Sequence, residues 1–332
     1  MSELRDSFGR RIDYLRISIT DRCNLRCVYC LPARGTRWQP RAELLNAEEL
    51  LRVIGTAAEL GVRRIRLTGG EPLVFPGLVD LVRRAALITG IEEISLTTNG
   101  MRLEALAPPL AEAGLARVNV SLDTLDPDKF RRITRGGDIR RVWRGLAAAE
   151  QCGLAPLKLN VVVVRGLNDD ELLPLAQQTL SHPWHVRFIE LMPVGNEGDW
   201  GVGFPAGPDR YLSVQAMQAR LAPLGLVPDS GPVGNGPARS YRLPGALGTV
   251  GFISPVGEHF CAACNRIRLT ADGRLRPCLL LDNEVPVREA LRSGAELAPL
   301  IALAVASKPE HHALLRADRQ TPQERFMCQI GG

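Results

Sequence analysis

Polar and apolar side chains alternate strictly in the stretch RVNVSLD, residues 117–123. Alternation with a period of two is typical of a β-strand, whose successive side chains point to opposite faces. The polar face consists of Arg117, Asn119, Ser121 and Asp123, and the apolar face consists of Val118, Val120 and Leu122. Such a strand packs its apolar face against other elements and presents its polar face to water or to a ligand.

Five further runs along the chain are strand-like, and amphipathic helix-like segments separate the strands. The predicted strands are Tyr14–Thr20, Arg64–Thr68, Glu93–Thr98, Arg117–Asp123, Leu157–Val164 and Val186–Met192. The predicted helices are residues 46–60, Leu78–Ile88, Leu103–Ala113, Val142–Gln151 and Glu171–Thr179. This repeat predicts a parallel sheet with right-handed crossovers. A closed eight-unit barrel takes roughly 250 residues. We therefore expect an α/β fold with an incomplete (β/α)6 TIM-type barrel.

The polar faces of the predicted strands favour a barrel over an open sheet. They recur as Arg16 with Ser18, Arg66 with Thr68, Ser95 with Thr97, and Lys158 with Asn160. Helices cover the outside of a barrel, so polar side chains are expected inside it, where they indicate a cavity for a polar ligand. The alternatives are an exposed sheet face and a doubly wound sheet, whose glycine-rich turn is missing after the first strand.

The character of the chain changes after Met192. Residues 193–210 and 228–238 are rich in glycine and proline and are interpreted as loops. A short helix is expected at Ser213–Leu224, a hairpin at Tyr241–Ile253 and helices at Val287–Leu291 and Ala295–Ala306, although the pattern in residues 228–256 constrains the fold loosely. We expect a partial barrel over residues 1–212 and a C-terminal region over residues 213–332 that closes it.

Composition limits the location and the partners of the protein. The chain has 332 residues, 45% of them hydrophobic, without a run of about eighteen apolar residues or a signal-peptide segment at the N-terminus. This pattern predicts a cytoplasmic protein with no membrane partner. A formal charge of +5, 5% aromatic residues and the lack of a nucleic-acid motif predict no nucleic-acid partner. Only Lys129, Lys158 and Lys308 are lysines, so a lysine stands out more than an arginine.

Six of the eight cysteines fall into two triplets, whereas Cys152 and Cys328 stand alone. The triplets are Cys23, Cys27 and Cys30, and Cys261, Cys264 and Cys278. Cytosolic thiols stay reduced, so clustered ones indicate metal binding rather than disulfides. A structural zinc ion is bound by four ligands, one more than each triplet provides. Three thiolates on a [4Fe–4S] cluster, in contrast, leave one iron open for a substrate or cofactor.

The first triplet and the end of the second predicted strand resemble the radical S-adenosylmethionine (SAM) superfamily. The matching residues are Cys23-x3-Cys27-x2-Cys30, with Tyr29 before the last cysteine, and the turn TGGEP, Thr68–Pro72. Small Gly69 and Gly70 would let the backbone approach SAM closely. Three scattered structural cysteines are the alternative.

Further stretches extend the resemblance over essentially the whole chain. They are LRISITDRCNLRCVYC, IRLTGGEP, LTTNG, VNVSLD, KLNVVVVRGLND, VRFIELMPVGN, FCAACNRIRLTADGRLRPCL and the terminal Gly-Gly. Together they resemble the GTP 3′,8-cyclase family of molybdenum cofactor biosynthesis. By this resemblance, Cys23, Cys27 and Cys30 hold one [4Fe–4S] cluster with SAM on its open iron, and Cys261, Cys264 and Cys278 hold a second cluster that contacts the GTP base. Zinc with His259 as fourth ligand is the alternative at the second triplet.

The resemblance also implies roles for residues outside the cysteine triplets. SAM would be contacted by Tyr29, Gly70, Ser121 and Met192. GTP would be held by Arg16, Arg66, Thr97, Lys158, Arg266 and Arg268, of which the first four belong to the polar strand faces. Arg266 and Arg268 would also take part in catalysis, together with Gly331 and Gly332 of the tail, which would reach into the active site. A buried triphosphate requires cationic partners.

The implied reaction is a radical cyclisation of GTP. An electron from the first cluster would split SAM into methionine and a 5′-deoxyadenosyl radical, which would take the ribose 3′ hydrogen, after which C3′ would attack C8. The product would be 3′,8-cyclo-7,8-dihydro-GTP, the first intermediate of molybdenum cofactor biosynthesis, for a downstream cyclic pyranopterin monophosphate synthase. No G-x-x-x-x-G-K-[ST] loop occurs, so GTP is interpreted as the substrate rather than an energy source. A low-potential electron donor is also implied, and a homodimer stays open.

Two rival functions and several unassigned residues remain. One rival is a radical SAM peptide-modifying enzyme, although such enzymes usually have more cysteines in their C-terminal extensions. The other is a non-catalytic iron–sulfur or zinc protein that binds nucleic acid. Cys152 is interpreted as a packing residue, Cys328 as a stray surface thiol or one that disturbs cluster assembly, and His311 with His312 as a solvated helix end.

Overall fold

Six parallel strands form the core of the computed structural model, which describes residues 3–33, 36, 38–194, 198, 200–231, 236–312 and 325–331. The six are β1 (Tyr14–Ser18), β2 (Arg64–Thr68), β3 (Glu93–Thr98), β4 (Arg117–Ser121), β5 (Lys158–Val163) and β6 (His185–Glu190). Each strand pairs in parallel with the next in the sequence. The predicted incomplete (β/α)6 barrel is confirmed.

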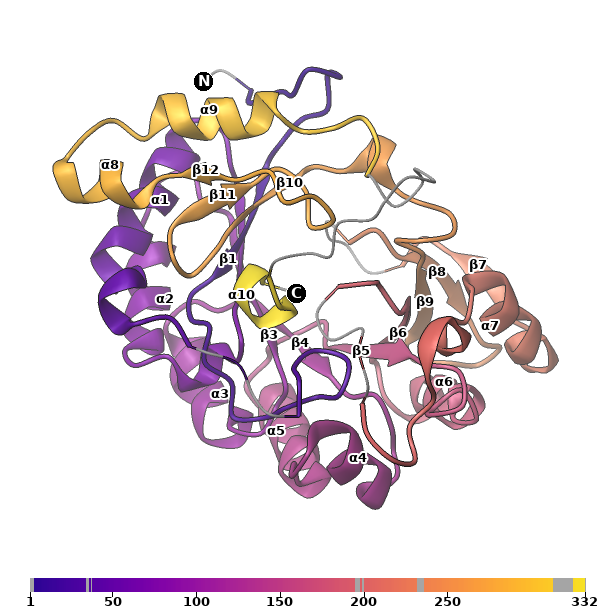
Figure 1. The fold of residues 1–332 in the computed structure, drawn as a ribbon. Helices are drawn as coiled ribbons and strands as arrows, with labels where there is room; N and C mark the ends of the chain where they lie inside the picture. Colours follow the sequence, from indigo (N-terminus) through magenta and orange to yellow (C-terminus); the bar gives the residue numbers. More distant parts are fainter. Residues whose placement is uncertain are drawn as a thin grey trace.

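Helices surround this curved sheet, as Figure 1 shows. They are α1 (Ala47–Glu59), α2 (Leu78–Ala86), α3 (Leu103–Glu112), α4 (Pro127–Thr134), α5 (Ile139–Gln151) and α6 (Leu172–Ser181). Asn46 and Glu49 form a reciprocal capping box at the start of α1. Helix α4 was not predicted, although Asp126 as N-cap and Pro127 as first residue give it a recognisable start.

The two faces of RVNVSLD separate as their alternation predicted. Val118, Val120 and Leu122 have no exposed surface and belong to one hydrophobic cluster with Leu110 of α3 and Leu146 of α5. The apolar face therefore packs outward against the helices.

The strand register brings polar residues to common levels inside the barrel. Arg16 on β1 lies opposite Arg66 on β2, and on its other side opposite Arg268. Asn119 on β4 lies opposite Lys158 on β5. Cationic side chains that are far apart in the sequence thus face the same interior space.

The C-terminal region extends the sheet at both edges. Its strands are β7 (Val227–Asp229), β8 (Arg239–Arg242), β9 (Thr249–Ile253), β10 (Arg266–Leu269), β11 (Arg274–Arg276) and β12 (Val285–Pro286). Strand β10 pairs in parallel with β1 and β9 in parallel with β6, whereas the outer strands are antiparallel. The β8–β9 pairing confirms the expected hairpin. The division at residue 212 stays a prediction, and the hydrogen-bonded sheet runs across it.

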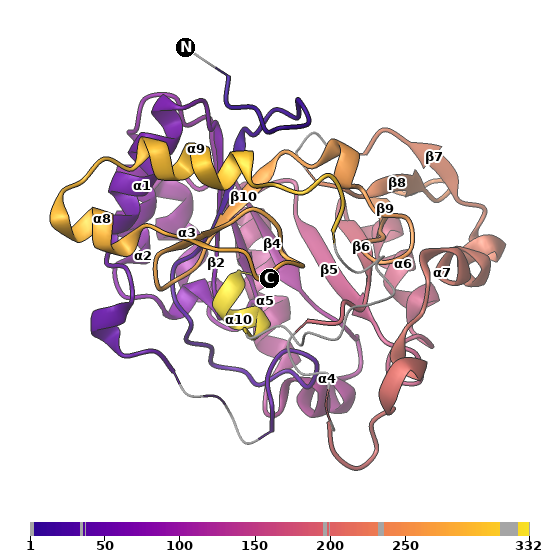
Figure 2. The same ribbon diagram turned by 45° about the horizontal axis from the view of Figure 1, so that its top comes forward.

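The C-terminal helices place the end of the chain inside the barrel. They are α7 (Val214–Leu221), α8 (Arg288–Ser293), α9 (Ala298–Ala306) and α10 (Met327–Ile330). Helix α9 packs on α1, and α10 contacts β1. Figures 1 and 2 both show α10 within the ring of strands. None of the helices described is long and apolar enough to cross a membrane.

Candidate active site

A cavity of about 320 Å³ lies within the barrel and is lined by most of the predicted site residues. These are Arg16, Cys23, Cys27, Tyr29, Cys30, Arg66, Gly70, Thr97, Ser121, Met192, Cys261, Cys264, Arg266, Arg268 and Cys278. Residues at the C-terminal ends of the parallel strands form much of its wall, where barrel sites are usually built. Both cysteine triplets and the predicted arginines therefore meet in one space.

The first cysteine triplet lies on the loop that follows β1. Backbone N–H groups of Cys30 and Leu31 both donate to the Cys27 carbonyl at 3.0 Å, so the loop turns tightly. Burial raises the pKa of Cys23 to about 11 and raises the pKa of Cys27 and Cys30 well above the ordinary value. The buried thiolates therefore need a cationic partner such as iron.

The spacing of the first triplet fits a polynuclear cluster better than a single zinc ion. Tetrahedral zinc, with Zn–S bonds of about 2.3 Å, holds its ligand atoms about 3.8 Å apart. Among the described residues, the one compact ligand group within 4.8 Å lies elsewhere, and the sulfurs of Cys23, Cys27 and Cys30 do not form one. The wider separation leaves room for a [4Fe–4S] cluster, which these residues would hold.

The glycines of TGGEP lie against the start of the cysteine loop. A Cβ on Gly69 would lie 2.4 Å from the Thr20 carbonyl oxygen, and one on Gly70 would lie 2.2 Å from that of Arg22. The Gly70 N–H donates to Thr20 at 2.7 Å. The expected reason for these glycines was close approach to SAM. The structure shows a further contact that requires them, with the backbone before Cys23, and the approach to SAM stays a prediction.

Tyr29 and Asp123 join the cysteine loop to β4 and β5. The Tyr29 hydroxyl donates to Asp123 Oδ2 at 2.6 Å, and the Val162 N–H donates to Oδ1 at 2.9 Å. Burial raises the pKa of Asp123 to about 6, in spite of these hydrogen bonds. Sequence reasoning placed Asp123 on the inner face but did not pair it with Tyr29. Because the Tyr29 hydroxyl is hydrogen-bonded to Asp123, we expect Tyr29 to contact a ligand through its ring or its backbone.

Five arginines concentrate positive charge on the cavity wall: Arg16, Arg66, Arg187, Arg266 and Arg268. Burial and mutual repulsion lower the pKa of Arg16, and they lower that of Arg187 to about 9 and that of Arg268 to about 10. A polyanion would relieve this repulsion.

The carboxylate of Glu190 also lines the cavity but is already engaged. It accepts hydrogen bonds from the Tyr211 hydroxyl and from the N–H groups of Val214, Val256 and Gly257. The wall as a whole therefore favours an anionic ligand.

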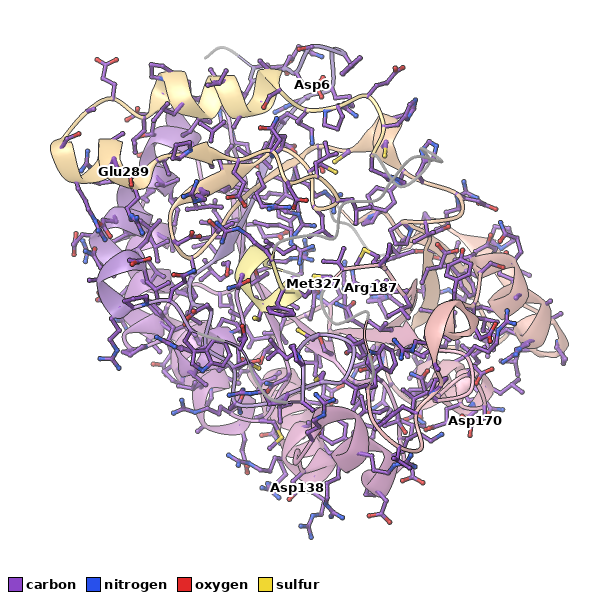
Figure 3. All side chains as sticks on the ribbon, viewed as in Figure 1. Asp6, Asp138, Asp170, Arg187, Glu289 and Met327 are labelled. Carbon is purple, nitrogen blue, oxygen red and sulfur yellow. The ribbon has the colours of Figure 1, made fainter. Side chains whose placement is uncertain are left out.

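Arg187 is a cavity residue that the sequence reasoning missed. Its Nη2 donates to Asn160 Oδ1 at 2.5 Å, and Figure 3 shows it near the centre of the ring. The sequence could have indicated it, because Arg187 is the third residue of β6 and lies in register with Asn160, a predicted inward residue. Because the chain is rich in arginine, a single arginine on a predicted strand was not taken as evidence for a site residue.

Lys158 lies beside the main cavity rather than on its wall. It lines a smaller cavity of about 80 Å³ with His185, and Arg187 borders both cavities. Only 4% of Lys158 is exposed, and burial, followed by repulsion from Arg187 and Arg117, lowers its pKa to about 7. Burial of the charged Lys158 ammonium is unfavourable unless an anion pairs with it, so we expect an anionic part of the ligand to reach this smaller cavity.

The second cysteine triplet contacts Lys308, another residue without a predicted role. The Lys308 Nζ donates to Cys264 Sγ at 3.5 Å and to the carbonyls of Arg266 and Pro277 at 2.8 Å. Burial acts to raise the pKa of Cys264, but Lys308 and Arg266 outweigh it, so the pKa falls below its usual value. Lys308 is one of only three lysines, and this rarity could have indicated it as a site residue from the sequence.

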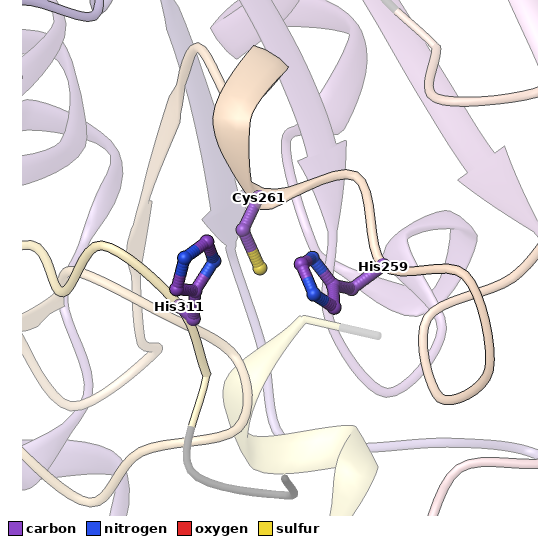
Figure 4. A group of neighbouring side chains, drawn as sticks. All are labelled: His259, Cys261 and His311. Atoms are coloured by element: carbon purple, nitrogen blue, oxygen red, sulfur yellow. The ribbon is translucent and has the colours of Figure 1, made fainter.

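Two histidines approach Cys261 of the second triplet, as Figure 4 shows. One ligand atom each of His259, Cys261 and His311 lie within 4.8 Å of one another. This compact group keeps the zinc alternative at the second triplet open. The expectation of a solvated helix end is wrong for the helix, because α9 ends at Ala306, and for His312, which is only 6% exposed, whereas His311 is exposed as expected.

The C-terminal tail enters the same site. Arg268 Nη1 donates to the Gly331 carbonyl oxygen at 2.6 Å, and a Cβ on Gly331 would lie 2.5 Å from Thr68 Oγ1. Gly332 lies outside the described residues. Cys328 is 2% exposed and lines the cavity, so its interpretation as a surface thiol is wrong.

Comparisons with known proteins agree with this geometry. Residues 17–178 match the family model for the radical SAM superfamily, and residues 184–314 match that for Molybdenum Cofactor Synthesis C. The chain is 52% identical to a GTP 3′,8-cyclase of Pelotomaculum thermopropionicum, over 99% of this chain and 100% of the relative. It is 51% identical to one of Moorella thermoacetica, with the same coverage.

The fold also matches that of a solved structure. The crystal structure of Streptococcus suis SuiB bound to S-adenosylmethionine gives a TM-score of 0.60 at 13% identity, over 90% of this chain and 69% of that one. The superfamily match and the full-length relatives together define a radical SAM enzyme. Within that class, the identity over the full length decides the family: this chain belongs to the GTP 3′,8-cyclases.

Proposed function

We propose that this chain converts GTP to 3′,8-cyclo-7,8-dihydro-GTP in the first step of molybdenum cofactor biosynthesis, by abstraction of the ribose 3′ hydrogen and formation of the C3′–C8 bond. The observation that carries the proposal is that both cysteine triplets and five arginines line one cavity. A substrate bound there would share one cavity with both triplets.

The SAM end of the cavity is assigned to the first triplet and its neighbours. Cys23, Cys27 and Cys30 hold a [4Fe–4S] cluster, which when bound supplies the electron that cleaves SAM to methionine and a 5′-deoxyadenosyl radical. Gly70, Ser121 and Met192 contact SAM together with Tyr29, which Asp123 orients. Their role is to hold the deoxyadenosyl 5′ carbon close to the substrate and away from water.

The arginines hold the triphosphate of GTP. Arg16, Arg66 and Arg268 lie at one level of the barrel through strand register, and Arg187 connects this level to Lys158. Guanidinium groups bind phosphate oxygens in pairs, which fixes the position as well as the charge of the substrate. Thr97 and Arg266 complete this wall, and the Gly331 carbonyl on Arg268 brings the tail beside the substrate.

Cys261, Cys264 and Cys278 would hold a second [4Fe–4S] cluster, which would supply an open iron as a contact for the guanine base. Its competitor is a zinc ion on His259, Cys261 and His311. Metal analysis of anaerobically reconstituted protein separates the two, since two clusters give about eight irons per chain, whereas one cluster with zinc gives about four. Cys264→Ser halves the iron content in the first case, and His259→Ala removes zinc in the second.

The wider setting of the reaction is part of the same proposal. A low-potential donor reduces the first cluster, and a cyclic pyranopterin monophosphate synthase consumes the product. The chain acts in the cytoplasm without a nucleic-acid or membrane partner, and formation of a homodimer is left to measurement.

The deciding experiment is an anaerobic incubation with dithionite, SAM and GTP deuterated at the ribose 3′ carbon. Deuterium in 5′-deoxyadenosine, detected by mass spectrometry, establishes the radical chemistry, the substrate and the abstracted hydrogen together. Unlabelled deoxyadenosine would leave the SAM chemistry standing and remove the GTP assignment. No deoxyadenosine from protein with a full first cluster would contradict catalysis itself.

A further inference from the structure

A fourth thiol faces the site of the first cysteine triplet. Cys328 lines the cavity with Cys23, Cys27 and Cys30, although it comes from α10 at the far end of the chain. The residue is 2% exposed, and its thiol hydrogen-bonds to the backbone of Cys328 itself. A buried thiol that borders the same cavity as three other thiols can act as a metal ligand once it is deprotonated.

Cys328 is in close contact with the triplet. Its peptide group hydrogen-bonds to the Cys30 thiol. Three thiols of one loop and a fourth from the tail thus surround a common volume.

The fold holds Cys328 in this position. Arg325 pairs with Asp272 at 2.9 Å before α10, and Arg268 binds the Gly331 carbonyl after it. Ile330, in the middle of this segment, has no exposed surface and packs against Val194. The helix is anchored on both sides, so the position of the thiol follows from tertiary contacts.

A [4Fe–4S] cluster has four irons, each of which takes one outer ligand, and a thiolate is the commonest one. Three cysteines of the loop leave one iron for SAM, and without SAM that iron is exposed to loss. We propose that, before SAM binds, the Cys328 thiolate caps the open iron of the first cluster and that SAM displaces it. The thiol releases its proton to solvent on binding iron and regains one when the SAM amino and carboxylate groups take its place.

Capping by Cys328 would connect SAM binding to the tail. Gly331, the residue bound by Arg268, comes three positions after Cys328. Release of the thiol by SAM therefore removes one contact of the segment that borders the GTP wall, while its two anchors remain. The inference rests on the radical SAM assignment but not on GTP as substrate. The Cys328 proposal and the GTP assignment are therefore contradicted by different experiments.

The test compares reconstituted parent protein with Cys328→Ala under limited oxidation, without GTP. Loss of an uncapped iron yields a [3Fe–4S] cluster, which electron paramagnetic resonance quantifies. We expect a severalfold larger [3Fe–4S] yield from Cys328→Ala without SAM, and equal yields once SAM is saturating. Both proteins have the same second triplet, so the difference reports on the first cluster. Equal yields without SAM would overturn the proposal.

Two further variants separate ligation from folding. Cys328→Ser retains the size of the side chain and the peptide contact to Cys30 but lacks the thiolate, and it should behave like Cys328→Ala. Cys152→Ala removes a thiol that is outside the cavity, at the end of α5, and should match the parent. Competition with Cys328 also weakens SAM binding in the parent, so Cys328→Ser should bind SAM more tightly. An unchanged SAM dissociation constant in that variant counts against capping.

Discussion

The guanidinium of Arg268 on β10 donates a hydrogen bond to the carbonyl oxygen of Gly331 at 2.6 Å. The contact joins the strand that extends the barrel beside β1 to the last described residue of the chain. Arg268 also belongs to the positive wall of the cavity, so one side chain contacts the tail and faces the substrate.

The tail can be tested with the smallest change available, Gly331→Ala. The added Cβ would meet Thr68 Oγ1 at 2.5 Å, and the residue has φ +70°, so the tail must leave its position. We expect loss of cyclised product while iron content stays at the parental level. Gly153→Ala is the matched control, because Gly153 has the same φ of +70° and nothing within 4 Å of the added Cβ. Parental turnover in Gly331→Ala would rule out a role for the tail.

Lys158 predicts proton uptake when GTP binds. Its pKa is about 7 in the free protein, because of burial and neighbouring arginines, and a triphosphate would raise it. Binding at about pH 8 should therefore take up close to one proton, and affinity should fall as pH rises above about 7. Calorimetry in buffers of different ionisation enthalpy measures this uptake.

The control for this measurement is a second lysine. Lys158→Met should bind GTP without the uptake, whereas Lys129→Met should retain it, since Lys129 pairs with Asp170 at 2.9 Å, outside both cavities. Equal uptake in Lys158→Met and the parent would show that another group titrates.

The same pKa predicts a change in stability. Below about pH 7 the buried Lys158 is charged in the folded and unfolded protein, and its desolvation opposes folding. Between pH 7 and its unfolded value of 10.5 the folded form loses this charge, so the penalty disappears as pH rises. Lys158→Met should therefore stabilise the substrate-free protein by about 1 kcal/mol or more near pH 6, and by less near pH 10. Urea unfolding at the two pH values checks the sign.

Arg187 should contribute to GTP binding but not to SAM cleavage. Loss of a charged hydrogen bond to phosphate costs about 1.5–3 kcal/mol, so Arg187→Gln should weaken GTP binding roughly 10- to 100-fold. Arg140→Gln removes one exposed arginine that pairs with Asp138 and serves as the charge control. Equal GTP affinity in the two variants would exclude Arg187 from the substrate wall.

Lys308 should be required for the second metal site and not for the first. Lys308→Met removes the contacts of Nζ with Cys264 Sγ and two carbonyls. We expect iron to fall from about eight toward about four atoms per chain, with the first cluster retained and SAM still bound. Iron analysis and SAM binding measure the two outcomes separately, and Lys129→Met is the control. Full iron content in Lys308→Met would contradict this role.

Local patterns in the sequence were enough to predict the barrel and most of the cavity wall. The alternation in RVNVSLD and its counterparts determines which side chains face inward, because successive residues of a strand point to opposite faces. Cysteine spacing in the loop after β1 likewise specifies a local ligand set. Both features depend on residues that are neighbours in the chain, so one sequence is sufficient to recognise them.

The tertiary structure alone decided which distant residues share the site. Arg187, Lys308, the His259–Cys261–His311 group and Cys328 reach it from separate segments. No local pattern links Cys328 to Cys30, because their contact depends on α10 packing inside the barrel, which Arg268 and Gly331 stabilise. The sequence by itself determined the strands, their inner faces and the cysteine loop. The contacts between the tail, the arginine wall and the two metal sites were decided only by long-range packing.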